Sequence, residues 1–187
     1  NIDQVSADYI GMLSTIMNGI ALSNFLSSNN CENSLFSSFA IGNFVKAYSK
    51  EEAEKSLVED KIVILVGGLG NPLFTTDSTA SVRAVELNSD VMLKATNVDG
   101  VYSDDPKVNK EAVKYEHLSF DEAITKNLKV MDQTSLCFCR DNNLSVRVFN
   151  ADAEGAILEA IINENTDIGT LVELEKWLMI FLMTQIM

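Results

Sequence analysis

The stretch Gly67-Gly68-Leu69-Gly70-Asn71-Pro72-Leu73-Phe74-Thr75-Thr76-Asp77 directly follows the apolar run Ile62–Val66. The apolar run predicts a buried strand, and the threonines with Asp77 predict the start of a helix that reaches about Leu87. A glycine loop between a strand and a helix start can present backbone N–H groups beside a helix dipole, an arrangement that holds phosphate or a nucleotide. The third glycine of a dinucleotide loop and the Gly-Lys-Ser/Thr of a P-loop are absent. A purely structural turn is the alternative interpretation of this loop.

The flanking sequence extends this unit into an alternation of strands and helices. A second apolar run, Val91–Ala95, completes a strand-helix-strand unit, which predicts a right-handed parallel crossover. The alternation predicts an α/β fold, a three-layer α/β/α sandwich with a mostly parallel central sheet. The other expected elements are a helix over Ile10–Phe25, capping boxes at Ser49/Glu52 and Ser119/Glu122, a hairpin over Val98–Tyr102, a helix over Asp132–Asp141, a strand over Ser145–Phe149, a helix over Glu154–Ile162 and a short segment over Gly169–Val172.

Composition and charge restrict the class of partner. The 187 residues carry a formal net charge of −13, and no Lys/Arg cluster offsets it, so nucleic acid is not expected as a partner. The spacing of Cys137 and Cys139 is too tight for a Cys-x-x-Cys zinc site, so these two residues and Cys31 are expected to be reduced thiols, as in a cytosolic protein. The single histidine, His117, lies in a polar stretch and is expected at the surface.

The two ends of the chain are atypical. The chain begins with Asn1 and shows no secretory leader, which suggests a fragment or a processed chain. Residues 174–187 contain the apolar run Trp177–Met183, far short of the roughly 20 residues that span a bilayer. Three interpretations of this tail stay open: a non-native extension, a packing helix, and membrane contact.

Three further places could carry chemistry. The segment Lys94–Pro106 puts a lysine, a threonine, an aromatic and several carboxylates at the end of a strand, where ligands bind in open α/β sheets. A solvated strand end and a simple turn at Asp99 are the plainer interpretation. Asp132 opens a helix, and an aspartate in that position is more often an N-cap than a catalytic group. The same ambiguity applies to Asp8.

Together these residues carry a strong resemblance to the bacterial uridylate (UMP) kinases of the amino acid kinase superfamily. The matching words follow one another in the family's order and cover about Val5 to Val172. Met17-Asn18 and the Phe74-Thr75-Thr76-Asp77 word separate uridylate kinases from aspartate, glutamate and acetylglutamate kinases. The words are D-Y-I-G-M-L-S-T-I-M-N-G, G-L-G-N-P-L-F-T-T-D, L-K-A-T-N-V-D-G-V-Y-S-D-D-P, L-K-V-M-D, C-R-D-N-N-L-S-V-R-V-F-N and G-T-L-V.

The resemblance implies transfer of the ATP γ-phosphoryl group to UMP with Mg²⁺, giving UDP and ADP in pyrimidine nucleotide biosynthesis. It also implies a cytoplasmic homo-oligomer, a hexamer in the family, with GTP and UTP as effectors and no membrane partner. A single kinase domain over residues 1–173 is expected, followed by the tail over 174–187. The resemblance gives Asp132 the role of the active-site aspartate that orients phosphate-binding lysines. It places the ATP base and ribose at Thr96, Tyr102 and Asp105, and UMP at Asp8, Gly68, Leu69, Gly70, Asn71, Pro72, Leu73, Phe74 and Thr75.

Two family words do not occur in the chain. The Lys-Leu-Ser-Gly-Glu strand and the Gly-Gly-Gly-Asn loop, which together hold the ATP phosphates in the family, are absent. Loss of one such charge or donor typically lowers a rate by about 10²–10³, so this chain alone is expected to be impaired, and its core strands incomplete. The alternatives are a non-catalytic fragment that binds a uridine nucleotide and another kinase of the superfamily.

Overall fold

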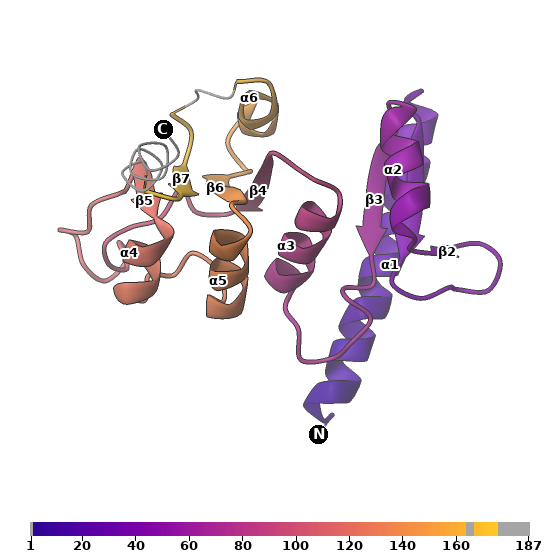
Figure 1. The fold of residues 1–187 in the computed structure, drawn as a ribbon, viewed down its shortest axis with the longest axis horizontal. Helices are drawn as coiled ribbons and strands as arrows, with labels where there is room; N and C mark the ends of the chain where they lie inside the picture. The colour runs from indigo at the N-terminus through magenta and orange to yellow at the C-terminus, as the bar shows by residue number, and fades with distance from the viewer. Residues whose placement is uncertain (1, 164–166, 176–187) are drawn as a thin grey trace, which may run out of the picture. The chain divides into compact units, whose positions relative to one another are not determined.

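The chain divides into two units, residues 1–79 and 80–187, and each is described separately. The structure, a computed structural model, describes residues 2–163 and 167–175. Figure 1 shows the order of the elements along the chain. One helix, α3 (Thr76–Glu86), contains the point of division.

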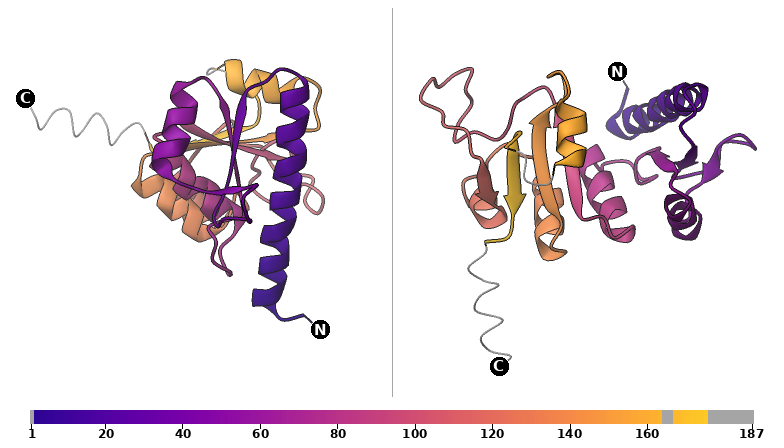
Figure 2. Two further views of the ribbon diagram at one scale, coloured as in Figure 1. Left: turned by 90° about the vertical axis from the view of Figure 1, so that its right-hand side faces the viewer. Right: turned by 90° about the horizontal axis from the view of Figure 1, so that it is seen from above.

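The first unit is a small parallel sheet between two helices. The strands β1 (Asn33–Ser37), β2 (Lys46–Ala47) and β3 (Ile62–Val66) pair in the order β2-β1-β3, and β1 is parallel to both neighbours. The helices α1 (Gln4–Ser28) and α2 (Lys50–Val58) lie on opposite faces of this sheet (Figure 2). The carboxyl end of β3 leads directly into the glycine loop.

The long helix α1 begins where Asp3 caps it. The Asp3 side chain accepts a hydrogen bond from the Ser6 N–H, and the helix then packs on β1 and β3 through buried Met12, Ile16 and Gly19. By length and composition α1 could cross a bilayer. Core helices of soluble proteins meet the same two criteria, so this property alone does not indicate a membrane span.

The second unit is a mixed sheet with helices on both faces. The strands β4 (Val91–Thr96), β5 (His117–Ser119), β6 (Ser145–Asn150) and β7 (Thr170–Glu173) pair in the order β4-β6-β7-β5. Only the β6–β7 pair is antiparallel. One core contains Val146 and Val148 with the helices α4 (Phe120–Thr125) and α5 (Gln133–Asp141). A second core joins Phe149 to α6 (Ala156–Ile162), because side chains alternate between the two faces of a strand.

Most of the predicted elements are confirmed, with shifted ends. The α/β class and the mostly parallel pairing are confirmed, as are the caps of α2 and α4, where Ser49 and Ser119 accept from the N–H of Glu52 and Glu122. The helix expected over Ile10–Phe25 is longer because the Asp3 cap lies two turns earlier. His117 is exposed, and the three cysteines are free thiols, as expected.

Of two predictions about strand connection, one stays a prediction and one is wrong. The strands β3 and β4 belong to different units, and each pairs along one edge with a strand of its own sheet, β1 and β6, so the parallel crossover between them stays a prediction. The hairpin expected over Val98–Tyr102 is absent, since Tyr102 bridges to Lys114 and the Val101 N–H donates to the Thr170 hydroxyl at 2.8 Å. All but the first two residues of the predicted 174–187 tail lie outside the described residues.

Candidate functional site

The glycine loop after β3 has an unusual backbone. Gly67, Gly68 and Gly70 have φ values of 78°, 59° and 80°, and Leu73 has a φ of 71°. A leucine in the left-handed region is strained, and such strain persists only where the surroundings fix the backbone. The loop is therefore held in one conformation by contacts outside itself.

Three side chains from distant parts of the first unit provide these contacts. The Thr15 hydroxyl on α1 accepts from the Gly67 N–H at 2.9 Å and donates to the Met12 carbonyl at 2.7 Å. The Ser38 hydroxyl, just after β1, donates to the Gly68 carbonyl. The Asp8 carboxylate accepts from the Leu73 N–H at 2.8 Å.

These contacts revise the sequence-based account of the loop. The N–H groups of Gly67 and Leu73 are bonded to side chains, and the Gly70 N–H donates to the Gly67 carbonyl at 3.2 Å. A Cβ at Gly67 would lie 2.7 Å from the Ser37 hydroxyl oxygen, so this glycine is also required for packing. Three amides of the loop are therefore already bonded within the protein, and part of the loop's glycine content is structural.

The loop and α1 enclose a cavity of about 370 Å³. Of the residues expected to bind UMP, Asp8, Gly68, Leu69, Asn71, Phe74 and Thr75 line it, whereas Gly70, Pro72 and Leu73 do not. Thr76, at the helix start that the sequence predicts, also lines it, whereas sequence reasoning missed the rest of the wall: Ala7, Gly11, Met12, Ser14, Thr15 and Thr79. The sequence did contain a signal for the α1 wall, since the small residues Ala7, Gly11 and Ser14 recur at helical spacing.

The start of α3 forms the polar end of this cavity. The Thr75 hydroxyl accepts from the Ser78 N–H at 3.1 Å, which makes Thr75 the cap of α3. Thr75 and Thr76 both line the cavity, so the positive end of the helix dipole lies at its wall. This end favours an anion.

The second unit contains a cavity of about 360 Å³ between the segment after β4 and the end of α4. Tyr102 and Asp105, two of the three residues expected to hold ATP, line it. Thr96 does not: it ends β4, and its carbonyl accepts from the Ala151 N–H at 2.8 Å. Lys126 and Lys129, which were not assigned a ligand of their own, also line this cavity.

Hydrogen bonds shift the pKa of two groups beside this cavity. The Tyr102 hydroxyl donates to Asp99 at 2.9 Å, and this bond raises the pKa of Tyr102 above its ordinary value. The Asn109 amide donates to Asp104 at 3.0 Å and lowers the pKa of that carboxyl. The two hydrogen bonds therefore favour the protonated phenol of Tyr102 and the ionised carboxylate of Asp104.

Asp132 is the N-cap of α5, as the more common interpretation predicted. Its two carboxylate oxygens accept from the Ser135 N–H at 2.9 Å and the Ser135 hydroxyl at 2.6 Å. Among the described residues, the wall of the neighbouring cavity ends at Lys129 and does not include Asp132. The structure thus shows Asp132 as a helix cap, and its role as the active-site aspartate stays a prediction.

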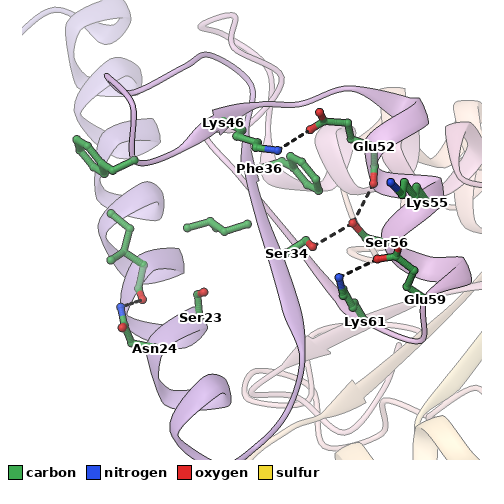
Figure 3. A pocket seen from close by; sticks show the side chains of 13 residues that line it. Ser23, Asn24, Ser34, Phe36, Lys46, Glu52, Lys55, Ser56, Glu59 and Lys61 are labelled. Atoms are coloured by element: carbon green, nitrogen blue, oxygen red, sulfur yellow. Dashed lines mark hydrogen bonds and ion pairs between the residues drawn. The ribbon is translucent and has the colours of Figure 1, made fainter.

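A third cavity, of about 610 Å³, lies in the first unit between α1 and α2 (Figure 3). Lys46, Lys55 and Lys61 line it, and two of the three are ion-paired, Lys46 with Glu52 at 3.5 Å and Lys61 with Glu59 at 2.7 Å. The hydrogen bond from Lys61 lowers the pKa of Glu59, and the same bond raises the pKa of Lys61. No motif in the sequence had pointed to this cavity.

Over residues 2–163 and 167–175, no group of three or more His, Cys, Asp or Glu side chains could hold a metal ion. Carboxylates do line the cavity of the second unit, at Asp104 and Asp105. One or two carboxylates suit Mg²⁺ that arrives with substrate phosphates, since Mg²⁺ keeps most of its ligands as water and phosphate oxygen.

Comparison with known proteins shows to which family this chain belongs. Residues 1–150 match the model of the amino acid kinase family, and the chain belongs to this family. A uridylate kinase of Alcanivorax borkumensis is 45% identical over 172 residues, which cover 92% of this chain and 68% of that protein.

Solved structures show the same relationship. The crystal structure of UMP kinase from Ureaplasma parvum matches with a TM-score of 0.86 and 40% identity, covering 92% of this chain and 73% of that one. The structure of UMP kinase from Bacillus anthracis matches with a TM-score of 0.87 and 40% identity, covering 92% and 70%. The resemblance inferred from the sequence words is therefore confirmed.

Proposed function

We propose that this chain is a UMP kinase, which transfers the γ-phosphoryl group of ATP to UMP and yields UDP and ADP. The observation that carries the proposal is the cavity beneath the glycine loop, built by Asp8, Thr15 and Ser38 around a strained backbone. Similarity to uridylate kinases at 40–45% identity supports the substrate.

The charges in the first cavity favour one orientation of bound UMP. One oxygen of Asp8 accepts from Leu73, and the other has no hydrogen-bond partner among the described residues, so it is available to a ribose hydroxyl or a base N–H. The same carboxylate repels phosphate. The helix start at Thr75 and Thr76 attracts phosphate. UMP would thus lie with its nucleoside toward Asp8 and its phosphate toward α3.

The second cavity is the proposed site for the base and ribose of ATP. Tyr102 and Asp105 supply a ring face and a carboxylate there, and Lys126 and Lys129 add positive charge. Thr96 would contribute only from the end of β4, outside the wall of the cavity. Asp104 and Asp105 would assist Mg²⁺, which neutralises charge on the phosphates when bound. Asp132, anchored to Ser135, would act by orienting nearby lysines.

We propose that the chain works as a cytoplasmic homo-oligomer under nucleotide control. Exposed apolar side chains on α1, at Ile10, Met17 and Phe25, support an assembly in which a second copy covers them. The third cavity, lined by Lys46, Lys55 and Lys61, supports an effector of the GTP or UTP kind, because its volume falls in the range of small-molecule sites. One kinase domain over residues 1–173 stays a prediction.

A coupled assay of ADP release tests the proposal. The 187-residue chain is mixed with ATP, Mg²⁺ and a panel of UMP, CMP, aspartate, glutamate and acetylglutamate. We expect turnover with UMP alone, and a rate below that of the longer relatives would confirm the expected impairment. Turnover of an amino acid would contradict the proposal. UMP binding in calorimetry without any turnover would instead support a non-catalytic uridine-nucleotide-binding chain.

A further inference from the structure

Two glycines in α1 have opposite surroundings. A Cβ added at Gly19 would lie 2.6 Å from the Val66 side chain, so this glycine lets α1 approach β3. A Cβ added at Gly11 would meet no atom within 4 Å. Packing within the described unit therefore explains Gly19 and gives no reason for Gly11.

Glycine inside a helix is unfavourable, because it loses more backbone freedom on folding than alanine does. Gly11 lies in the middle of α1, and its helical conformation is open to any residue. Alanine at this position would be expected to stabilise the helix without a clash. A glycine that folding does not require points to a requirement of another kind.

The open space at Gly11 belongs to the cavity beneath the glycine loop. Gly11 lines that cavity between Asp8, one turn earlier in α1, and Thr15, one turn later. The helix start at Thr75 and Thr76 supplies the anion-binding end of the same cavity, while Asp8 makes its own end unfavourable for phosphate. An uncharged part of a ligand would fit beside Gly11.

We propose that Gly11 is a specificity-determining residue, whose missing side chain makes room for the nucleoside end of the acceptor nucleotide. This inference rests on the proposed function of the first cavity. It predicts that a side chain at this position stabilises α1 and weakens nucleotide binding, because it fills the space that the nucleoside needs.

The test compares Gly11→Ala and Gly11→Leu with the wild-type chain. UMP affinity is measured by isothermal titration calorimetry, and the melting temperature is measured without nucleotide. We expect Gly11→Ala to melt about 2–4 °C higher, as a gain in helix propensity should produce in a chain of this size. We expect Gly11→Leu to bind UMP at least about tenfold more weakly, since a misplaced side chain in a pocket has effects of this order.

A matched control adds the same side chain elsewhere on α1. Ala21 is exposed and lines none of the three cavities, so Ala21→Leu should leave UMP affinity within about twofold of wild type. Wild-type affinity in Gly11→Leu, with UMP binding intact in the wild-type chain, would overturn the inference alone. A lower melting temperature for Gly11→Ala would also overturn it, because the glycine would then serve the fold. A wild-type chain that binds no UMP would overturn the proposed function and this inference together.

Discussion

Two polar loops follow parallel strands in this chain, and they are held in different ways. The loop after β3 is fixed by Asp8, Thr15 and Ser38, which are 65, 52 and 30 residues away from the loop residues that they contact. In the segment after β4, the side-chain bonds from Tyr102 to Asn109 join residues within ten positions of one another.

The difference shows which loop is built before its ligand arrives. The first loop has long-range anchors and a leucine at positive φ, so its conformation depends on the fold of the whole first unit. From Tyr102 to Asn109 the second segment consists of local turns in which aspartate and asparagine side chains bond to nearby backbone and side-chain groups, and a long-range bond from the Val101 N–H to the Thr170 hydroxyl holds its start. We therefore expect mutations at distant positions to disturb the first loop, and local mutations to dominate in the stretch from Tyr102 to Asn109.

Removal of the Asp8 anchor should have the largest effect. Asp8→Ala leaves the Leu73 N–H without its acceptor and also removes the carboxylate proposed to bind the nucleoside, and loss of a nucleoside hydrogen bond to a charged group corresponds to about a 10- to 100-fold loss of UMP affinity. Asp8→Asn keeps an acceptor oxygen and should lose clearly less. Calorimetry with UMP checks the pair, and equal losses in the two variants would contradict an anchoring role.

Thr15→Val, a change of similar shape, should come second. It removes the acceptor of the Gly67 N–H, and a neutral hydrogen bond of about 1 kcal/mol corresponds to roughly fivefold faster exchange of that amide. Thr15→Ser retains the hydroxyl and serves as the control. Hydrogen exchange followed by NMR without nucleotide provides the measurement. Unchanged protection of Gly67 in Thr15→Val would show that the loop does not need this anchor.

Tyr102→Phe should have a smaller and local effect. It removes the bond to Asp99 at a half-exposed site, so the free energy of unfolding should change by no more than about 0.5 kcal/mol. The KM for ATP should rise by about two- to threefold, since the Tyr102 hydroxyl no longer offers ATP a neutral contact. The KM for UMP should not change. Steady-state kinetics with each substrate varied in turn provides the measurement. An equal rise in the KM for ATP and the KM for UMP would contradict the assignment of this cavity to ATP.

The smallest effect concerns pH. The bond to Asp99 raises the pKa of Tyr102 above 10.0, so the folded chain holds this proton more tightly than the unfolded chain. This difference stabilises the folded chain below pH 10.0, and the stabilisation is lost as the pH rises through the raised pKa of Tyr102. Ultraviolet spectroscopy of phenolate should show one late transition that Tyr102→Phe removes. A late transition that persists in the variant would rule out this assignment.

The sequence predicted what depends on local chemistry. The caps at Ser49 and Ser119, the strand Ile62–Val66 and the loop after it follow from residue types at fixed spacing. Strand pairing did not follow, because alternation of strands and helices does not say that β3 pairs with β1. The strand β1 was missed, since Asn33-Ser34-Leu35-Phe36-Ser37 contains only two apolar residues.

The candidate site likewise contains residues that could be predicted from the sequence and residues that could not. The loop residues of the UMP cavity were found from their sequence word, whereas Gly11, Ser14 and Thr15 were missed because only the fold brings α1 beside the loop. Thr96 was placed in the ATP cavity by analogy and lies outside its wall. Contacts between residues 30 to 65 positions apart cannot be read from spacing along one chain.

An NMR titration of the 187-residue chain with UMP tests the central claim most directly. If the loop after β3 is a preformed acceptor site, the amides of Gly67 and Leu73 are already protected from exchange without nucleotide, and UMP shifts resonances of α1, the loop and the start of α3. Unprotected amides in the free chain, or shifts confined to the second unit, would contradict it.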